Sequence, residues 1–412
     1  MQATEIKFID GGICAPLGFS AGGLHCGVKT KNPDKKDVAI IASSVPCRAA
    51  GVFTKNVVVS DAVLLTKKRL EGGALQAVIV NSGNANVCAE GGYAAAEREA
   101  RAAAEALGLP ETYVAVASTG VIGQKLNIEA IEAGVPALAG LLEHSAQGSD
   151  GAAAAIMTTD TVKKEYAIEV SLGGKAVRIG GIAKGSGMIH PNMGTMLSFI
   201  TTDAAISQTA LKQALRRAAD YSFNRISVDG DTSTNDTCLT LANGLAENAE
   251  IAENTPEYAL FEEALTALCR RLAIDMAADG EGATHLITCR ISGANCEEDA
   301  VVLAKSVISS SLLKAAIFGR DANWGRILCA MGYAGVKFNV GEVSVDFSSA
   351  AGVISVCKNG CGLDFDEELA KTILSEHDIV IEIAAGSGMG SAECWGCDLT
   401  YDYVKINGDY RS

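Results

Sequence analysis

The chain has 412 residues, enough for two or three domain-sized lobes around a large buried core. Its net charge of −15 disfavours nucleic acid and anionic membranes as partners, and no apolar run reaches the ~18 residues that a membrane span needs. The N-terminal residues contain no basic stretch followed by an apolar core, so we expect no signal peptide. The 13 cysteines are therefore expected to be reduced thiols in the cytoplasm.

The first part of the chain predicts strands that alternate with helices. Residues 38–45 and 76–80 are short apolar runs typical of buried strands, and residues 51–70 predict a strand followed by a helix. Residues 89–108 are rich in alanine with charges on one side, which predicts a helix that Gly108 closes.

The middle of the chain predicts a hairpin and a helix. Residues 165–185 contain two alternating stretches joined at Gly173 and Gly174, the pattern of a two-stranded hairpin. Residues 207–223 are predicted to be a helix with Ser207 as its N-cap. These patterns indicate a mixed α/β fold with several hairpins rather than a regular βαβ repeat.

The C-terminal part predicts further helices and strands. Residues 256–291 predict a long helix, a turn and a strand, and residues 297–332 predict a helix, a turn and another strand. Residues 397–412 alternate apolar and polar side chains, which predicts a final strand that ends in a polar tail.

Residues 184–203, KGSGMIHPNMGTMLSFITTD, place Thr195 at the start of an apolar run. One interpretation is a β-branched residue that suits the first position of a strand. The other is a nucleophile that becomes active when the peptide bond after Gly194 is cut. A freed α-amino group titrates near ~8, so at neutral pH part of it is an unprotonated base beside its own hydroxyl.

Three other patterns suggest a cofactor or a metal only weakly. Residues 386–390 lack the glycine spacing of a dinucleotide fingerprint. The acidic residues in 229–236 lack the glycine and glutamate of an EF-hand loop. The cysteine pairs at 357/361 and 394/397 could form a zinc knuckle, but small buried thiols are the simpler interpretation. We expect no metal.

The segment KGSGMIHPNMGTML resembles the self-cleavage motif of the ornithine acetyltransferase family, also called glutamate N-acetyltransferase, of arginine biosynthesis. That family usually has alanine where this chain has Gly194. Further motifs resemble the family in the same order along essentially the whole chain: STG at 118–120, IMTTDT at 156–161, DGDTSTNDT at 229–237, GRDANWGR at 319–326 and NGDYRS at 407–412.

The resemblance implies a mixed-sheet α-β-β-α sandwich and self-processing into two chains. The expected products are an alpha chain, residues 1–194, and a beta chain, residues 195–412. The alpha and beta chains are expected to associate as a heterotetramer with two copies of each.

The resemblance also implies roles for individual residues. Thr195 is expected to be the cleavage-exposed nucleophile, with cleavage between Gly194 and Thr195. Thr119 and Gly120 are expected to form the oxyanion hole. Within 156–161 the resemblance favours Thr158, with Thr159 and Thr161 as close alternatives. The substrate-binding residues expected from the resemblance are Thr158, Lys184, Thr195, Glu281, Asn407 and Ser412.

Residues around 318–326 match another family pattern. Asp321, Asn323 and Arg326 are expected either to position substrate or to shape the pocket, whereas a structural role is at least as plausible for Trp324.

The implied reaction moves the acetyl group of N2-acetylornithine to glutamate through an acetyl-threonine ester, without a cofactor. Some members of the family also accept acetyl-CoA, so it is a possible co-substrate here. Two alternatives stay open. The chain could be an aminopeptidase or amidohydrolase with an N-terminal threonine nucleophile, in which water replaces glutamate. An unprocessed chain could instead be a non-catalytic amino-acid-binding protein.

Overall fold

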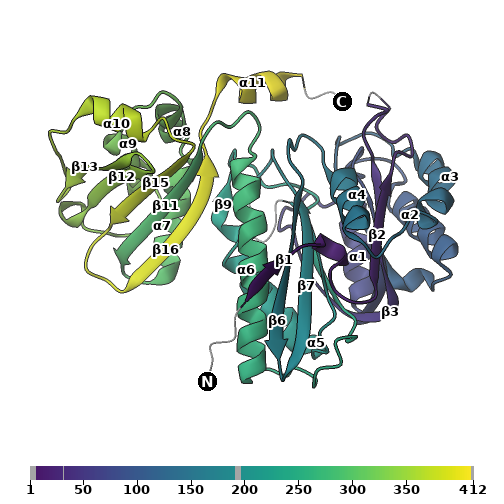
Figure 1. The fold of residues 1–412 in the computed structure, drawn as a ribbon. Helices are drawn as coiled ribbons and strands as arrows, with labels where there is room; N and C mark the ends of the chain where they lie inside the picture. The colour runs from purple at the N-terminus through teal and green to yellow at the C-terminus, as the bar shows by residue number, and fades with distance from the viewer. Residues whose placement is uncertain (1–5, 31, 191–195, 410–412) are drawn as a thin grey trace.

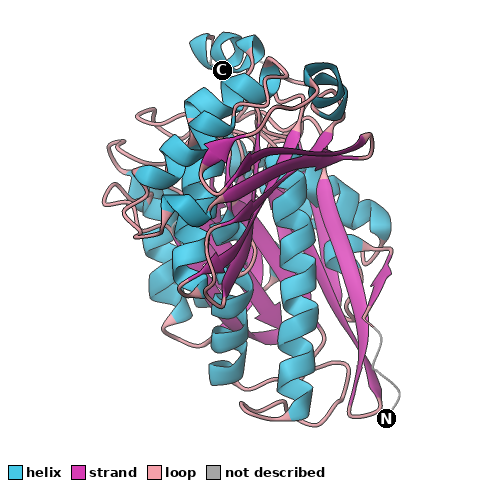
Figure 2. Cartoon of the chain, turned by 90° about the vertical axis from the view of Figure 1, so that its left-hand side faces the viewer, coloured by secondary structure: helices cyan, strands magenta, loops and turns pink. Residues whose placement is uncertain are grey.

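The computed structural model describes residues 6–30, 32–190 and 196–409. Figure 1 shows two lobes joined near the long helix α6 (Pro256–Ala278). The larger lobe contains a nine-stranded sheet and the smaller lobe a seven-stranded sheet. In Figure 2 the smaller lobe faces the viewer, and its strands lie in front of helices of the larger lobe.

The sheet of the larger lobe mixes parallel and antiparallel pairs. Residues 165–185 form the predicted hairpin, because β6 and β7 pair in antiparallel register up to Leu172 and Lys175. The strand order is β1 (Lys7–Ile9), β6 (Lys164–Leu172), β7 (Lys175–Lys184), β8 (Leu197–Thr202), β10 (Thr237–Ala242), β3 (Val38–Phe53), β4 (Ala74–Asn81) and β5 (Val114–Ser118), with β2 (Phe19–Leu24) beside β3.

The sheet has two halves that face each other across one core: a first half around β7, β8 and β10, and a second half around β3, β4 and β5. Inward residues of β7, β8 and β10, such as Phe199, share a buried cluster with residues of β3, β4 and β5, such as Ile41, and with helix α4 (Ala146–Ile156). Helices α5 (Gln208–Asp220) and α6 cover the outer face of the first half. The outer face of the second half is covered by α1 (Asp61–Leu70), α2 (Gly92–Leu107) and α3 (Ile128–Ala139).

The resulting layers are α-β-β-α, so the predicted sandwich is confirmed. Strand β3 serves both halves, because its register shifts between Ala42 and Cys47. Before the shift its outward residues pack under α1 and α3, and after it they pack under α5. The predicted helix after residue 207 is also confirmed, since the Ser207 hydroxyl accepts from the Ala210 N–H at 3.1 Å as the N-cap of α5.

The smaller lobe packs a second sheet against helices around a separate core. Its strand order is β14 (Cys361–Gly362), β13 (Gly352–Lys358), β12 (Ser344–Ser349), β15 (Asp378–Ala384), β11 (Leu286–Ala294), β16 (Gly390–Cys397) and β9 (Ile226–Ser227). Its helices are α7 (Glu297–Ser309), α8 (Ser311–Phe318), α9 (Trp324–Gly332) and α10 (Glu367–Ile373). Short 3-10 helices occur at η1 (Gly12–Cys14), η2 (Glu111–Tyr113), η3 (Phe223–Arg225) and η4 (Val340–Glu342).

Two sequence predictions in this part of the chain are wrong. The strand predicted at the end of residues 297–332 is helix α9, which begins where the Asn323 side chain caps the Arg326 N–H at 3.1 Å. The strand predicted within 397–412 is helix α11 (Tyr401–Gly408), which begins at the N-cap Thr400. Figure 1 shows α11 above the gap between the lobes.

Among the described residues, no single helix is long and apolar enough to cross a membrane. Helices α7 and α8, bent by 57° at their junction, meet the length and composition criteria only as a pair.

Candidate active site

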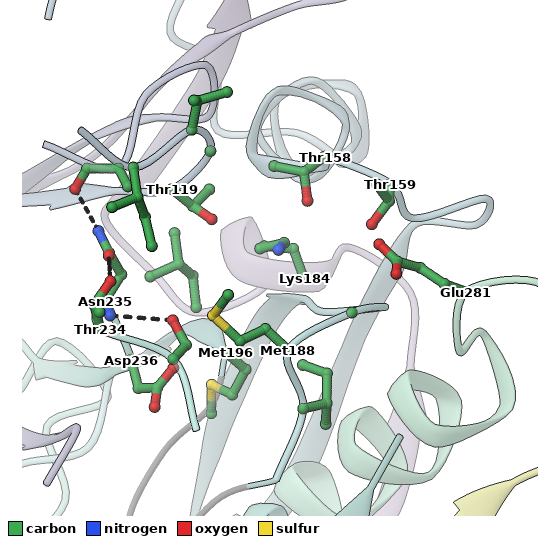
Figure 3. Close-up of a pocket in the computed structure, with 18 of the residues that line it drawn as sticks. Thr119, Thr158, Thr159, Lys184, Met188, Met196, Thr234, Asn235, Asp236 and Glu281 are labelled. Carbon is green, nitrogen blue, oxygen red and sulfur yellow. Dashed lines mark hydrogen bonds between the residues drawn. The ribbon is translucent and has the colours of Figure 1, made fainter. Parts of the chain in front are cut away.

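A cavity of about 280 Å³ lies where loops at the ends of β5 and β7 meet the start of β8. All six predicted site residues that the structure describes line this one cavity: Thr119, Gly120, Thr158, Lys184, Glu281 and Asn407. Figure 3 labels four of them, Thr119, Thr158, Lys184 and Glu281. Met196 also lines it, so the residue that follows the predicted nucleophile is in place. The remaining predictions, Gly194, Thr195 and Ser412, lie outside the described residues.

The turn after β5 presents Thr119 and Gly120 to the cavity. The Thr119 N–H is already used, because it donates to the Asn81 carbonyl at 2.9 Å. The groups that the turn can offer to a substrate oxygen are therefore the Thr119 hydroxyl and the Gly120 N–H. Gly120 has φ +132°, and a Cβ there would lie 2.6 Å from the Gly83 carbonyl carbon. Only glycine fits this turn without displacing it.

Asparagine side chains hold this turn from two directions. The Asn81 amide donates to the Ser118 hydroxyl at 2.8 Å. Asn235, from the other half of the sheet, donates to the Ser118 carbonyl at 2.7 Å and to the Ala85 carbonyl at 2.6 Å. These bonds fix the donor groups in advance, which is the arrangement that stabilises a developing oxyanion.

Lys184 is the last residue of β7, and it is only 7% exposed. Burial lowers the pKa of Lys184, and the charge of Asp160 opposes that shift. Asp160 also accepts the Gly185 N–H at 2.7 Å and the Thr158 N–H at 3.0 Å. One carboxylate therefore places both Thr158 and the backbone beside Lys184.

The sequence analysis missed the buried ion network that includes Asp160. The Lys164 ammonium donates to Asp160 at 2.8 Å and to Asp279 at 2.6 Å, and all three side chains are nearly inaccessible to solvent. Burial raises the pKa of Asp160, but Lys184 and Lys164 outweigh it and hold that pKa below its usual value. Asp279 also binds the Thr161 N–H and hydroxyl, so Thr161 is structural. Among the threonines predicted at 158–161, Thr158 and Thr159 line the cavity.

We expect Asp160→Asn to destabilise the protein by about 3–5 kcal/mol near pH 7, because it removes the main counter-charge of buried Lys184 and leaves buried Lys164 with Asp279 alone. The folded pKa of Asp160 is depressed, so its contribution is present above its ordinary pKa and is lost as the pH falls through the lower folded value. The gap in thermal unfolding temperature between wild type and variant should therefore narrow in strong acid. Asp150→Asn is the matched control, because the Asp150–Lys163 pair is exposed and should contribute under about 1 kcal/mol.

Glu281 and Asn407 close the opposite side of the cavity. The Asn407 amide donates to the Glu281 carboxylate at 2.7 Å, so helix α11 returns from the smaller lobe to the site. The Thr400 hydroxyl, which caps α11, donates to the Gly282 carbonyl at 2.7 Å and ties the helix to the Glu281 turn. A Cβ at Gly187 would lie 2.4 Å from the Glu281 carboxylate, so a side chain at position 187 would displace that carboxylate.

Two aspartates of the segment 229–237 have different roles. Asp229 accepts the N–H groups of Met188 and Ile189 at 2.6 and 2.9 Å, so it anchors the loop that leads to the predicted cleavage segment. Asp236 is buried and lines the cavity, and burial raises its pKa well above the usual value. The cavity therefore contains a carboxyl group with a raised affinity for a proton. Among the described residues no cluster of three or more His, Cys, Asp or Glu side chains could hold a metal.

The motif at 319–326 is not part of the cavity. Neither the cavity described above nor its neighbour is lined by Asp321, Asn323 or Arg326. Asn323 caps α9, and the Arg326 guanidinium donates to the Leu312 carbonyl at 2.5 Å. Trp324 packs against the core of the smaller lobe. The prediction that these residues shape the pocket is therefore wrong, and in the described structure they build the α8–α9 connection.

Comparison with known proteins identifies the family. Residues 20–412 match the model of the ArgJ family. The chain is 50% identical over 408 residues to the arginine biosynthesis bifunctional protein ArgJ of Symbiobacterium thermophilum, an alignment that covers 99% of this chain and 100% of that relative. It is 45% identical over 414 residues to the protein of the same name from Bacillus subtilis, covering 100% of this chain and 99% of the relative. A crystal structure of the protein from Bacillus halodurans aligns at 44% identity and a TM-score of 0.49, over 51% of this chain and 97% of that chain. The chain therefore belongs to the ArgJ family.

Proposed function

We propose that the protein is an acetyltransferase of arginine biosynthesis that moves the acetyl group of N2-acetylornithine to glutamate through an ester on Thr195. The observation that carries the proposal is the single cavity that unites a pair of oxyanion donors, a buried cation and a carboxylate–amide pair. These are the groups that an N-acetylated amino acid with a free carboxylate and a second amine would need. The family supports the same conclusion, because its curated relatives are named bifunctional proteins of arginine biosynthesis.

In the first half-reaction the Thr195 hydroxyl attacks the acetyl carbonyl of N2-acetylornithine and passes its proton to its own freed α-amine. The negative charge of the tetrahedral intermediate faces the Gly120 N–H and the Thr119 hydroxyl. The carbon–nitrogen bond then breaks, the proton goes to the departing amine, and ornithine leaves an acetyl ester on Thr195. Lys184 holds the substrate carboxylate, and Glu281 holds an ammonium group of the amino acid.

In the second half-reaction the uncharged amine of glutamate attacks the ester carbonyl, and the same two donors bind the same oxyanion. The ester bond breaks, the threonine oxygen regains a proton, and N-acetylglutamate leaves. Ornithine and glutamate use one cavity in turn, because the acceptor can enter only after the first product has left.

The competing candidate is a hydrolase in which water, not glutamate, takes the acetyl group. The deciding experiment follows N-acetylornithine by mass spectrometry with and without glutamate. We expect N-acetylglutamate to form with glutamate present, and an acetyl adduct on the fragment that begins at Thr195 without it. Free acetate released at the same rate in both reactions would support the hydrolase.

The proposal includes self-cleavage into an alpha chain, 1–194, and a beta chain, 195–412, two of each in one cytoplasmic assembly. The sheet supports continued association of the fragments. Strands β7 and β8, which would belong to different fragments, pair from Ile179–Thr202 to Lys184–Leu197, and β3 pairs with β10 along six residue pairs.

We expect two bands on a denaturing gel but one species in size-exclusion chromatography, because separating the fragments would break the sheet at its centre. A moderate salt concentration should not separate them, since the contacts are backbone hydrogen bonds and apolar packing. Elution of the fragments at different volumes in native buffer would contradict the prediction.

A further inference from the structure

A buried glutamate on helix α2 has no role in the proposed reaction. Glu99 is 0% exposed and lies on the face of α2 that also carries the buried residues Ala96, Ala100 and Ala103. Neither of its carboxyl oxygens has a hydrogen-bond partner within ordinary distance and angle limits among the described residues. An ionised carboxylate is unstable in such a place, so the side chain is expected to be uncharged near neutral pH.

No charged side chain compensates Glu99. Helix α2 packs mainly against β4, β5, α1, α3 and η2, and the two strands carry no charged residue. The charged or titratable side chains of the other three elements are Asp61, Lys67, Lys68 and Arg69 on α1, Glu129 and Glu132 on α3, and Glu111 and Tyr113 on η2. None of them acts on the pKa of Glu99, which burial raises to about 8 against an opposing effect of the Asn81 side chain.

Cys26 is the described titratable group on which Glu99 acts in turn. Burial raises the pKa of the Cys26 thiol to about 12, with smaller contributions from the charges of Asp37 and Glu99. The thiol therefore stays uncharged and supplies no counter-ion.

Asn81 connects Glu99 to the oxyanion turn. It is the last residue of β4, and its carbonyl accepts the Thr119 N–H at 2.9 Å. Its side-chain amide donates to the Ser118 hydroxyl at 2.8 Å, and its side-chain oxygen accepts the Asn84 N–H at 3.3 Å. An amide group has two N–H donors, so one serves Ser118 and the second is available to Glu99.

We propose that Glu99 is a positioning residue of the oxyanion hole, whose uncharged carboxyl group keeps the Asn81 side chain in the orientation that fixes Thr119 and Gly120. The inference rests on the proposed function, because the orientation of this turn affects the reaction only if its donors bind an oxyanion. Glu99 itself does not line the active-site cavity, so it acts through Asn81 and not on the substrate.

The charge on Glu99 decides whether Asn81 keeps that orientation. An uncharged carboxyl group is a modest acceptor, so Ser118 retains its amide donor. Hydrogen bonds to an ionised carboxylate are about twice as strong, so an ionised Glu99 would draw the amide away from Ser118 and shift the backbone that holds Thr119. The uncharged form is present below the pKa of Glu99 and is lost as the pH rises through about 8. Acetyl transfer should therefore weaken over the same range.

The test compares the pH dependence of the first half-reaction in wild type and in Glu99→Gln. Glutamine has nearly the same shape, can accept from the Asn81 amide and cannot ionise. The acetylation of Thr195 by N2-acetylornithine, without glutamate, is followed by rapid quenching and mass spectrometry from about pH 6 to about pH 10. For wild type we expect the rate to rise as the freed α-amine loses its proton and then to fall as Glu99 ionises. For Glu99→Gln we expect the rise without the fall, and a rate about tenfold or more above wild type at the alkaline end.

Glu99→Leu tests the hydrogen bond to Asn81 without the charge. Leucine is of similar size but offers no acceptor, so kcat near pH 7 should fall about tenfold, less than the roughly 10²–10³-fold loss of a whole oxyanion donor. The KM for N2-acetylornithine should stay unchanged, because the oxyanion forms only in the transition state. Glu105→Gln, an exposed position on the same helix, is the matched control and should keep the wild-type rate and pH profile. Unfolding temperatures measured at each pH ensure that only folded protein is compared, and if Glu99→Leu does not fold, the pH profile of Glu99→Gln decides alone.

The possible results separate the inference from the proposed function. An alkaline fall of equal size in wild type and Glu99→Gln, or none in wild type, would overturn the inference and leave the proposed function standing. A folded Glu99→Leu variant with the wild-type kcat would also overturn it. A wild-type enzyme that forms no acetyl adduct on Thr195 at any pH would refute the proposed function itself.

Discussion

Thr195→Ala is expected to lower the rate of acetyl transfer from N2-acetylornithine to glutamate by roughly 10⁴-fold or more, because it removes the atom that carries the acetyl group. The same change removes the hydroxyl that attacks the preceding peptide bond, so the chain should stay intact at 42.4 kDa. Intact-mass analysis measures both effects in one sample. It should find one unprocessed chain and no acetyl adduct after incubation with N2-acetylornithine.

Thr195→Ser is the matched control, because serine keeps both the hydroxyl and the ability to expose an α-amine. It should be cleaved, carry an acetyl adduct and retain measurable transfer. Transfer by Thr195→Ala at the wild-type rate would refute the covalent mechanism. An uncleaved but active serine variant would show instead that the freed amine is not the base.

The site was more predictable from sequence than the elements that build it. Thr119, Lys184, Glu281 and Asn407 are far apart in the chain, yet motif resemblance assigned each to one site, and all four line one cavity. Motif resemblance works across such distances because it compares residues with a known arrangement and needs no knowledge of the local backbone. The same method failed at 319–326, where the motif stabilises the smaller lobe and not the site.

The errors in secondary structure have a local cause. Helix α11 buries none of its residues, and Tyr401 and Val404 are 83% and 68% exposed. Such a helix shows no apolar face of period 3.6, so the alternation within 397–412 predicted a strand. The bonds that fix α11, from Thr400 to Gly282 and from Asn407 to Glu281, join residues over one hundred positions apart and leave no periodic signal.

The network of Asp160, Lys164 and Asp279 could not be found for a related reason. A buried charged residue has the same letter as an exposed one, and charged residues are far more often exposed. Only Asp160 and Lys164, spaced by four residues, suggest a pair. That spacing brings side chains together in a helix, but Asp160 lies in a loop and Lys164 is the first residue of β6. The partner Asp279 follows helix α6, more than one hundred residues later.

Gly120→Ala is expected to reduce kcat by about 10²–10³-fold, the cost of losing one oxyanion donor. The new methyl group would lie 2.6 Å from the Gly83 carbonyl carbon and 2.7 Å from the Asn84 nitrogen. Both are backbone atoms of a loop that hydrogen bonds hold in place: the Asn84 N–H donates to the Asn81 side chain, and the Asn86 N–H donates to the Asn84 side chain. The turn and not the loop must therefore move. The reduction should be the same whichever acetyl donor is used, because the carbonyl of every donor would face the same oxyanion donors.

Gly123→Ala is the matched control for this substitution. Gly123 also has a positive φ, +78°, but nothing lies within 4 Å of its added Cβ. Both substitutions place an L-residue at a positive φ, which costs on the order of 1–3 kcal/mol, so the thermal unfolding temperature should fall for both variants. A loss of kcat confined to Gly120→Ala separates donor placement from strain. Equal losses in the two variants would mean that the Gly120 N–H does not bind the oxyanion, and that the Thr119 hydroxyl or a group outside the described residues takes that role.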